Sequence, residues 1–478
     1  MAIEWSGLSP ELLVRLDRSA GQPLRAQLEG SLRDAIRDGR LRGGERLPSS
    51  RELARELGVS RGMVQECYGQ LLAEGYLASR TGSATRVAGI RERPAAPAPK
   101  TPEPARPAPD RALIADFQTG VPDLASFPRN DWAWAVRQAC AEVASADLGY
   151  GDPRGSAVLR EVLAGYLRRV RAAAADPRQM IISTGFAQGL NLVLRALIRD
   201  GGVSRVAFED PGYGSPQSDE TVRATLAMGL RAEFVPVDDD GLVVSALAAS
   251  GAQAVVVTPA HQSPTGVVLS AARRHALLAW AERTGGYVIE DDYDSEFRYD
   301  KEPVGTLQGL APDQVFLVGT ASKALAPAVR LGWVHAPAPL AQAVAGEKEM
   351  SDRGSCTLDQ LALATLLTSG RYDRHLRRMR AVYGGRRAAL VAAFARHSPG
   401  VRLTGLAAGF QAVAPLPPGA DEASVIAAAR ERRVGLHGIG QFRGVPDAAA
   451  PPALVIGFGN VGERAIDPAI AAVAGLLR

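Results

Sequence analysis

The chain has 478 residues, of which 46% are hydrophobic and 22% charged, with a net charge of +4. This length exceeds one ordinary hydrophobic core, so the sequence predicts two or three domains. The cysteines, Cys67, Cys140 and Cys356, lie far apart without paired spacing, which argues against both a disulfide framework and a zinc site. With no export signal at the amino terminus and no apolar run long enough to span a bilayer, we expect a soluble, cytoplasmic protein without a membrane partner.

Two segments near the amino terminus have the pattern of short helices. From Pro23 to about Gly39 an apolar residue recurs every fourth position, which makes one apolar stripe on a helix. Ser49 or Ser50 can cap a second helix, which Gly58 ends.

A third helix follows after a short turn. Ser60 can cap it, it runs from Arg61 to Glu74, and a two-stranded wing is expected around Gly82. This is the helix-turn-helix arrangement, which places the start of its second helix in the DNA major groove. Arg61 stands at that start, where arginine can bind guanine through two hydrogen bonds. The spacing alone also allows a small helical bundle with solvated arginines.

Three stretches favour the DNA-binding alternative: LPSSRELA at 47–54, LGVSR at 57–61 and LAEGYL at 72–77. They resemble the winged helix-turn-helix of the GntR family. The residues expected to contact double-stranded operator DNA are Arg51, Ser60, Arg61, Gln65 and Arg80. Gly62 and Met63 stand where the family often has threonine, and the wing ending is atypical, so the resemblance implies the DNA-binding fold but not the base preference.

Prolines crowd the next segment, residues 89–111, where no apolar period is present. Such a segment cannot fold alone and favours an extended spacer of roughly 3.1 Å per residue. We therefore expect a DNA-binding domain at 1–88, a linker at 89–111 and a large domain at 112–478.

The large domain alternates helical stretches with short apolar strands, which predicts the α/β class with a mainly parallel sheet covered by helices. The expected strands lie at 180–182, 206–208, 254–257, 287–289 and 315–318. Ligands of such sheets gather at the carboxyl ends of the strands.

Lys323 follows the last of these strands through a turn of small residues. A lysine whose amine is kept partly neutral can form a Schiff base with an aldehyde cofactor. Arg330 would lie on the same face if the segment is helical, and it suits an aldehyde that bears a phosphate, namely pyridoxal phosphate (PLP). A single lysine after a strand is more often a solvated surface residue, so the case depends on the other strand ends.

Those strand ends carry matching groups. The turn at 183–188 opens a helix whose free N–H groups can bind phosphate. Tyr213 could offer a flat surface to an aromatic ring, although a loop tyrosine is more often ordinary packing. Asp291 could keep a pyridine nitrogen protonated, and Tyr293, on the same face, could bond the ring hydroxyl.

Four stretches, YGDPRG at 150–155, TPAHQSPTG at 258–266, IEDDYD at 289–294 and the segment 322–330, resemble a fold type I PLP-dependent aminotransferase domain with a smaller C-terminal α+β subdomain. Joined to a GntR domain, they resemble the MocR/GabR subfamily of bacterial transcription regulators. The cofactor-binding residues that this implies are Gly185, Phe186, Ala187, Tyr213, Asp291, Tyr293, Ser322, Lys323 and Arg330, with Lys323 as the catalytic Schiff-base lysine. The resemblance also implies a head-to-tail homodimer.

Two departures concern chemistry. Ser263 stands where aminotransferases have asparagine, and Val455 stands where they have an arginine that binds the substrate carboxylate. Valine cannot make that salt bridge, and the spacing of Arg443 gives no positive reason to treat it as a substitute. The leading hypothesis is a PLP-dependent transcription regulator that senses PLP itself or an amine or amino-acid effector. The alternative is a working aminotransferase with an attached DNA-binding domain.

Overall fold

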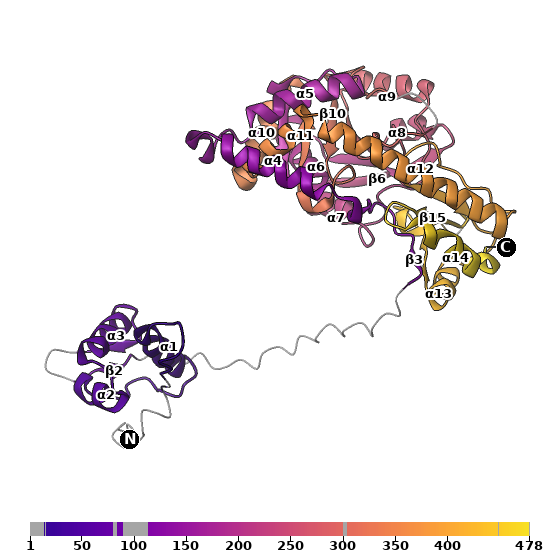
Figure 1. Ribbon diagram of the computed structural model, residues 1–478. Coiled ribbons are helices and arrows are strands. Elements are labelled where there is room, and N and C mark those ends of the chain that lie inside the picture. Colours follow the sequence, from indigo (N-terminus) through magenta and orange to yellow (C-terminus); the bar gives the residue numbers. More distant parts are fainter. Residues whose placement is uncertain are drawn as a thin grey trace. The chain divides into compact units, whose positions relative to one another are not determined.

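The computed structural model describes residue 14 and residues 16–79, 84–88, 113–299, 304–447 and 449–477. The chain divides into two compact units, one within residues 1–109 and one within residues 110–478 (Figure 1). None of the described helices is both long and apolar enough to cross a lipid bilayer.

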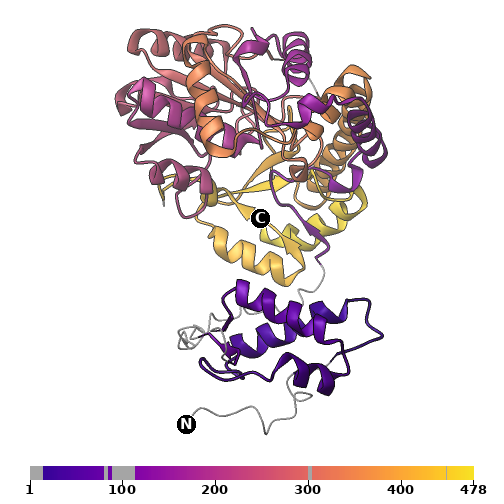
Figure 2. The same cartoon turned by 90° about the vertical axis from the view of Figure 1, so that its left-hand side faces the viewer.

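The amino-terminal unit is a three-helix bundle with a short antiparallel hairpin (Figure 2). Its elements are α1 (Leu24–Arg37), α2 (Ser50–Leu57), α3 (Arg61–Ala73), β1 (Leu77–Ala78) and β2 (Arg86–Val87). Ser49 caps α2 in a reciprocal bond with Glu52, and Gly58 ends that helix at φ +62°. Ser60 caps α3. The three predicted helices are confirmed, and the cap of the second is Ser49.

One apolar cluster holds this unit together. Leu28 and Leu32 of α1, Leu53 of α2, and Val64 and Leu71 of α3 are fully buried in it. The four-residue spacing of α1 therefore forms the buried stripe that the sequence predicts. Because α2 and α3 share this core, the packing fixes the orientation of one helix relative to the other.

The larger unit is built on an eight-stranded sheet in the order β4-β11-β10-β9-β8-β5-β6-β7. Its strands are β4 (Met180–Ser183), β5 (Arg205–Asp210), β6 (Arg231–Asp238), β7 (Gly241–Leu242), β8 (Ala254–Val257), β9 (Tyr287–Asp292), β10 (Val315–Thr320) and β11 (Gly332–His335). Strand β11 is antiparallel to both neighbours and β7 is antiparallel to β6, whereas the other pairs are parallel. The mainly parallel sheet is confirmed, and β4, β5, β8, β9 and β10 end at one edge.

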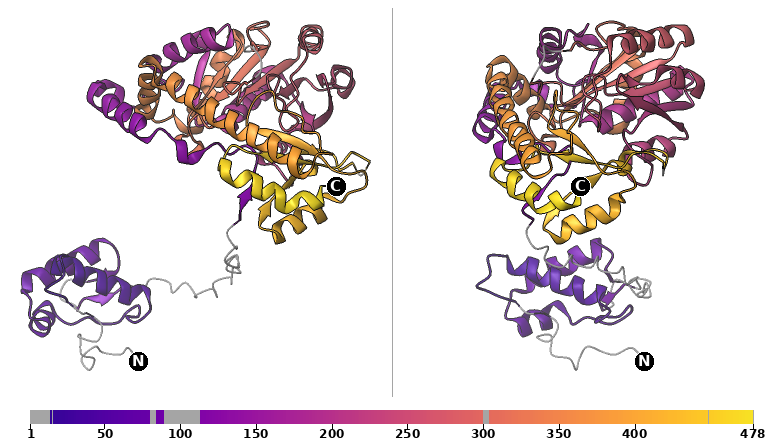
Figure 3. Two further views of the ribbon diagram at one scale, coloured as in Figure 1. Left: turned by 45° about the vertical axis from the view of Figure 1, so that its right-hand side comes forward. Right: turned by 90° about the vertical axis from the view of Figure 1, so that its right-hand side faces the viewer.

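Helices cover both faces of this sheet (Figures 1 and 3). The helices of this unit are α4 (Arg129–Glu142), α5 (Ala157–Arg171), α6 (Phe186–Gly201), α7 (Glu220–Ala227), α8 (Val244–Ser250), α9 (Ala271–Thr284), α10 (Ala338–Asp352), α11 (Thr357–Thr368), α12 (Arg371–His397), α13 (Glu422–Glu431) and α14 (Glu463–Val473). Ala254 and Val256 of β8 join the apolar cluster of α6 and α10, whereas Val255 and Val257 join that of α8 and α9. Burial on both faces explains why the strand is wholly apolar.

A smaller C-terminal subdomain follows the long helix α12, which packs against α14. Its antiparallel sheet has the order β12-β15-β14, from β12 (Gln411–Pro415), β15 (Ala453–Gly457) and β14 (His437–Gly438). A separate parallel pair joins β13 (Val434–Gly435) to β3 (Ala115–Asp116). The α/β fold class with a smaller α+β subdomain is therefore confirmed.

Candidate functional site

The carboxyl ends of the parallel strands meet around one cavity of about 390 Å³. Lys323 comes from the turn after β10, Asp291 from β9, Tyr293 from the residue after β9, and Tyr213 from the loop after β5. Eight of the nine residues expected to bind the cofactor line this cavity, and the ninth, Gly185, immediately precedes the lining residue Phe186. Neighbouring parallel strands bring these distant parts of the sequence together.

Lys323 donates a hydrogen bond from Nζ to the Gly120 carbonyl oxygen at 2.6 Å. Burial lowers the pKa of this lysine, and the carboxylates of Asp291 and Asp294 oppose that shift. The net lowering increases the fraction of neutral amine, which is the form that attacks an aldehyde.

The segment from Lys323 to Arg330 is not an α-helix, so the condition for a shared helix face of these two residues is not met. After β10 the chain makes turns, then a single 3₁₀ turn at Pro327–Val329, and Arg330 has a left-handed backbone at φ +52°. Ala326 is extended because the residue before a proline is disfavoured in the helical region. This irregular turn still places Lys323 and Arg330 on the same cavity.

Asp291 carries a buried carboxyl group that is only partly satisfied. Its Oδ2 accepts a hydrogen bond from the Tyr213 hydroxyl at 2.6 Å, whereas Oδ1 has no partner among the described residues. Burial raises the pKa of Asp291 to about 8, against the opposing effects of the Tyr213 hydrogen bond and the Lys323 charge. The unpaired oxygen in the cavity wall is suited to a ligand N–H.

Tyr213 bonds Asp291 and has ring contacts with Phe186 and, edge-on at 5.9 Å between centroids, with Phe208. Besides bonding Asp291, its ring lies parallel to that of Phe186, at 5.7 Å between centroids and 4° between planes. Burial, followed by the Asp291 charge, raises the pKa of the Tyr213 hydroxyl well above its usual range, so it remains a donor. Its stacking on a cofactor ring stays a prediction.

A group of potential hydrogen-bond donors lies at the start of α6. Gly185 precedes the helix at φ +117°, and no side chain caps the first turn. A Cβ on Gly185 would lie 3.6 Å from Nη1 of Arg330, so the guanidinium lies against this turn. The hydroxyl of Ser322, bonded to Thr320 at 2.9 Å, faces the same cavity. Free helix N–H groups, a hydroxyl and an arginine together suit a phosphate.

Two residues next to Tyr293, His261 and Asp294, were not predicted from the sequence as part of the site. The His261 side chain, after β8, lies 2.8 Å from Asp294 and is fully buried. The two belong to different motifs, 33 positions apart, and the parallel pairing of β8 with β9 brings these motifs side by side.

The structure also shows what surrounds Val455 and Arg443. Val455 is fully buried in β15 and packs with Val413 and Ile439. Burial raises the pKa of Asp210, and the charge of nearby Arg443 opposes that shift. Neither Val455 nor Arg443 is among the described residues that line the cavity.

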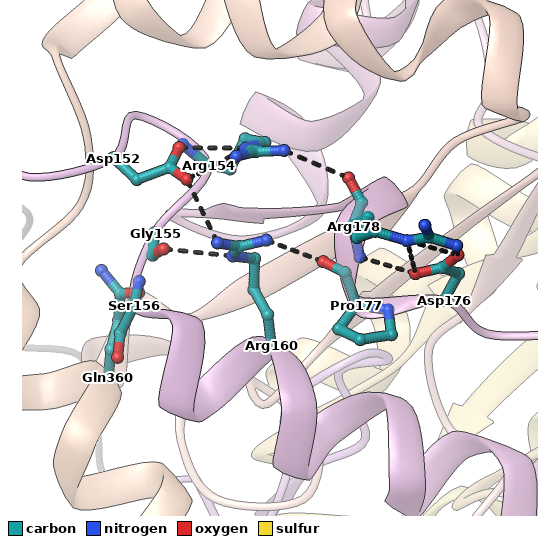
Figure 4. Close-up of polar contacts among 9 residues, drawn as sticks. All are labelled: Asp152, Arg154, Gly155, Ser156, Arg160, Asp176, Pro177, Arg178 and Gln360. Atoms are coloured by element: carbon teal, nitrogen blue, oxygen red, sulfur yellow. Dashed lines mark hydrogen bonds and ion pairs between the residues drawn. The ribbon is translucent and has the colours of Figure 1, made fainter.

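The loop with the YGDPRG motif is anchored by arginines (Figure 4). Asp152 bonds Arg154 at 2.7 Å and Arg160 at 3.1 Å, and Arg160 also donates to the Pro177 carbonyl at 2.8 Å. Tyr150, at the start of the motif, is 79% exposed. The polar network therefore holds the base of this loop while its aromatic end faces outward.

In the amino-terminal unit, Arg51, Arg61 and Gln65 are exposed, on α2 and α3. Ser60 is exposed too, but its hydroxyl accepts the Met63 N–H at 3.2 Å. Arg80 lies outside the described residues. The helix pair thus presents two arginines and a glutamine on its outer side, at the positions where a helix-turn-helix meets DNA.

Two family models match the chain. Residues 24–87 match bacterial regulatory proteins of the gntR family, and residues 114–443 match aminotransferase class I and II. Among solved structures, an archaeal alanine:glyoxylate aminotransferase superposes with a TM-score of 0.68 at 26% identity, over 76% of this chain and 90% of that chain. The chain is therefore a DNA-binding transcription regulator with a fold type I aminotransferase-like domain.

Curated relatives of this chain are transcription regulators by name. The pyridoxine biosynthesis transcriptional regulator PdxR of Corynebacterium glutamicum is 36% identical over 79% of this chain and 80% of its own length. The probable rhizopine catabolism regulatory protein MocR of Rhizobium meliloti is 34% identical over 80% of this chain and 79% of its own. The HTH-type regulator YhdI of Bacillus subtilis is 30% identical over 94% of this chain and 95% of its own. This protein belongs to the MocR/GabR type of GntR-family transcription regulators.

Proposed function

We propose that this protein is a PLP-dependent regulator whose aminotransferase-like domain changes its affinity for operator DNA when PLP binds. The observation that carries the proposal is the convergence of Lys323, Asp291 and Arg330 on one cavity. Each suits a different part of the same molecule, namely its aldehyde, its ring nitrogen and its phosphate.

The neighbouring residues complete this fit. Lys323, with its lowered pKa, would hold the aldehyde as a Schiff base. The unpaired Oδ1 of Asp291 would accept the pyridine N–H. Arg330, Ser322 and the first N–H groups of α6, at Phe186 and Ala187, would hold the phosphate beside Gly185. Tyr213 would cover the ring and Tyr293 would bond its hydroxyl. Bound PLP supplies an electron sink at the amine carbon.

For the DNA side, we propose that α3 enters the major groove with Arg61 and Gln65 facing base edges, while Arg51 meets a phosphate. Their exposure at the start of α3 and on the preceding helix supports this arrangement. Ser60 would hold the start of α3, and Arg80 is proposed from the sequence alone. The parts of the chain remain as proposed from the sequence: DNA-binding domain 1–88, linker 89–111 and effector domain 112–478, in a head-to-tail homodimer.

Substituting the two arginines should separate these roles. Arg61→Ala should weaken operator binding by about 1 to 3 kcal/mol and relax base preference, because a bidentate guanine contact is lost. Arg51→Ala should weaken binding to all DNA alike and lower the salt slope by about one. Titrations of operator and random DNA over a range of salt measure both effects.

Arg33→Ala is the matched control, because Arg33 belongs to the same unit but pairs with Glu74 at 3.0 Å. It should leave both DNA affinities nearly unchanged. Equal losses from Arg61→Ala on specific and random DNA would contradict the proposed groove geometry.

The effector end of the cavity favours PLP itself over an amino acid. The position of the usual carboxylate-binding arginine is filled by buried Val455, and Phe442, packed on that cluster, lines the cavity instead. A ligand shifts an equilibrium only through its differential affinity for two states. We therefore expect common α- and γ-amino acids to change the operator affinity of the PLP-loaded protein by less than a factor of about five.

Operator titrations of PLP-loaded protein with a panel of amino acids test this expectation. A large change with one amino acid would point instead to an effector clamp, with Arg443 as the residue to substitute. Repeated turnover of an amino acid would favour the alternative of a working aminotransferase.

A further inference from the structure

A buried histidine and aspartate, His261 and Asp294, lie next to Tyr293. The side chains of His261 and Asp294 are 0% and 3% exposed, and Nδ1 of His261 lies 2.8 Å from Oδ2 of Asp294. Burial lowers the pKa of His261, but the Asp294 carboxylate and the Gly405 carbonyl outweigh it, and the net shift is upward. Burying an ion pair costs desolvation free energy, so the pair does not by itself indicate a stabilising role. The groups that contact the pair therefore suggest its function.

Tyr293 is the partner that faces the cavity. Its hydroxyl oxygen lies 3.1 Å from Nδ1 of His261, and it donates to the His261 carbonyl oxygen at 3.0 Å. An ionised carboxylate only accepts hydrogen bonds, so Nδ1 carries a hydrogen that points toward Asp294 and Tyr293. The same N–H can support the oxygen of Tyr293 when its hydroxyl hydrogen turns away from the backbone carbonyl toward the cavity.

We infer that His261 and Asp294 are positioning residues for Tyr293, holding its hydroxyl as a donor to the phenolic oxygen of bound PLP. The inference rests on the proposed binding of PLP at Lys323. His261 itself does not line the cavity. It acts through Tyr293, whose pKa is raised well above its usual range by burial, so the hydroxyl keeps its proton for donation.

The pair is closed from the other side by the loop before β12. Nε2 of His261 lies 3.3 Å from the Gly405 carbonyl oxygen, and a Cβ at Gly409 would overlap both Asp294 and His261. The charge of Arg298 also acts on His261, in the direction that lowers its pKa. The charged groups facing His261 are thus Asp294 and Arg298. After burial, the charges of Asp294 and then Asp291 raise the pKa of Tyr293.

The test is a pH titration of the absorbance of the PLP-loaded full-length protein. A hydrogen bond to the ionised phenolic oxygen stabilises the deprotonated form of the bound cofactor and lowers its apparent pKa. Tyr293→Phe should therefore raise that pKa by about one pH unit. His261→Leu should raise it by somewhat less. His261→Asn, which keeps a donor near the position of Nδ1, should largely restore the wild-type value.

Coupling between the residues distinguishes positioning from a general disturbance. Adding His261→Leu to Tyr293→Phe should cause no further shift, because the two act through one hydroxyl. Gly409→Ala should shift the pKa upward by pressing on the pair, whereas Gly419→Ala, also at positive φ but with nothing within 4 Å, should not. The glycine variants keep the test available if His261→Leu does not fold.

The possible failures are distinct. If wild-type protein binds PLP and His261→Leu and Gly409→Ala leave the apparent pKa unchanged, the positioning role is wrong. If wild-type protein forms no Schiff base at Lys323, the proposed function itself fails.

Discussion

Lys323→Ala should abolish the covalent attachment of PLP. The lysines of the sequence are Lys100, Lys301, Lys323 and Lys348, and Lys323 is the one that lines the described cavity. Without its amine the aldehyde has no nucleophile at this position, although Arg330 and Asp291 could still bind PLP noncovalently. Borohydride reduction followed by peptide mapping measures the attachment.

Wild-type protein should carry the reduced cofactor on Lys323, and the variant should carry none. Lys348 is an internal control, because its buried amine bonds Asp352 at 2.7 Å and Gln188 at 3.0 Å and should remain unmodified. Reduction that tagged Lys348 or either of the other two lysines would contradict the assignment.

Asp291→Asn should change both the pH dependence of stability and the effect of PLP. Burial raises the pKa of Asp291 to about 8 in the folded protein, against about 3.9 in an unfolded chain. Between these values the folded state binds the extra proton, so this group lowers the free energy of unfolding as pH rises from about 4 to about 8. Asparagine has no charge to bury and removes that part of the slope.

Denaturant unfolding of both apoproteins at pH 5 and pH 8 measures this difference. From pH 5 to pH 8, the free energy of unfolding of the variant should rise relative to that of wild type by roughly 2 to 5 kcal/mol. PLP should then stabilise wild type more than the variant, because the ionised carboxyl accepts the ring N–H. Parallel pH profiles for the two proteins would contradict the role of Asp291.

Much of the fold follows from local signals. The four-residue stripe of α1, the serine caps of α2 and α3, and Gly58 each act within a few residues of themselves, and all appear where the sequence predicts them. The fully apolar strand β8 likewise signals burial on both faces. Asp291 lies near the end of one apolar run and Lys323 follows another, so these local patterns also predicted that both residues lie at the edge of the sheet.

The conformation of the segment after Lys323 stayed open in the sequence, since the shared face of Lys323 and Arg330 required a helix. Pro327 disfavours the helical conformation at Ala326, and the segment forms an irregular turn. The irregular turn still brings Arg330 to the start of α6. The proline therefore decides the local conformation, and the tertiary fold rather than a seven-residue helical spacing brings Lys323 and Arg330 to one cavity.

The pairing of His261 with Asp294 could not be predicted in this way. Both residues stand in recognised motifs, but nothing in the local pattern of either says which side chain lies opposite. Their contact depends on the parallel pairing of β8 with β9 and on the loop at Gly405. Such tertiary contacts are the part of the site that required the structure.

The most direct test of PLP-dependent regulation is operator binding by apoprotein and by PLP-loaded protein at one fixed salt concentration, with Lys323→Ala beside them. The account predicts that PLP changes the operator affinity of wild-type protein by about 5- to 150-fold, the usual range of coupling between two sites, and that the change is reduced or lost in Lys323→Ala. Equal operator affinities for the apo and PLP-loaded wild-type protein, with the cofactor shown to be linked to Lys323, would contradict it.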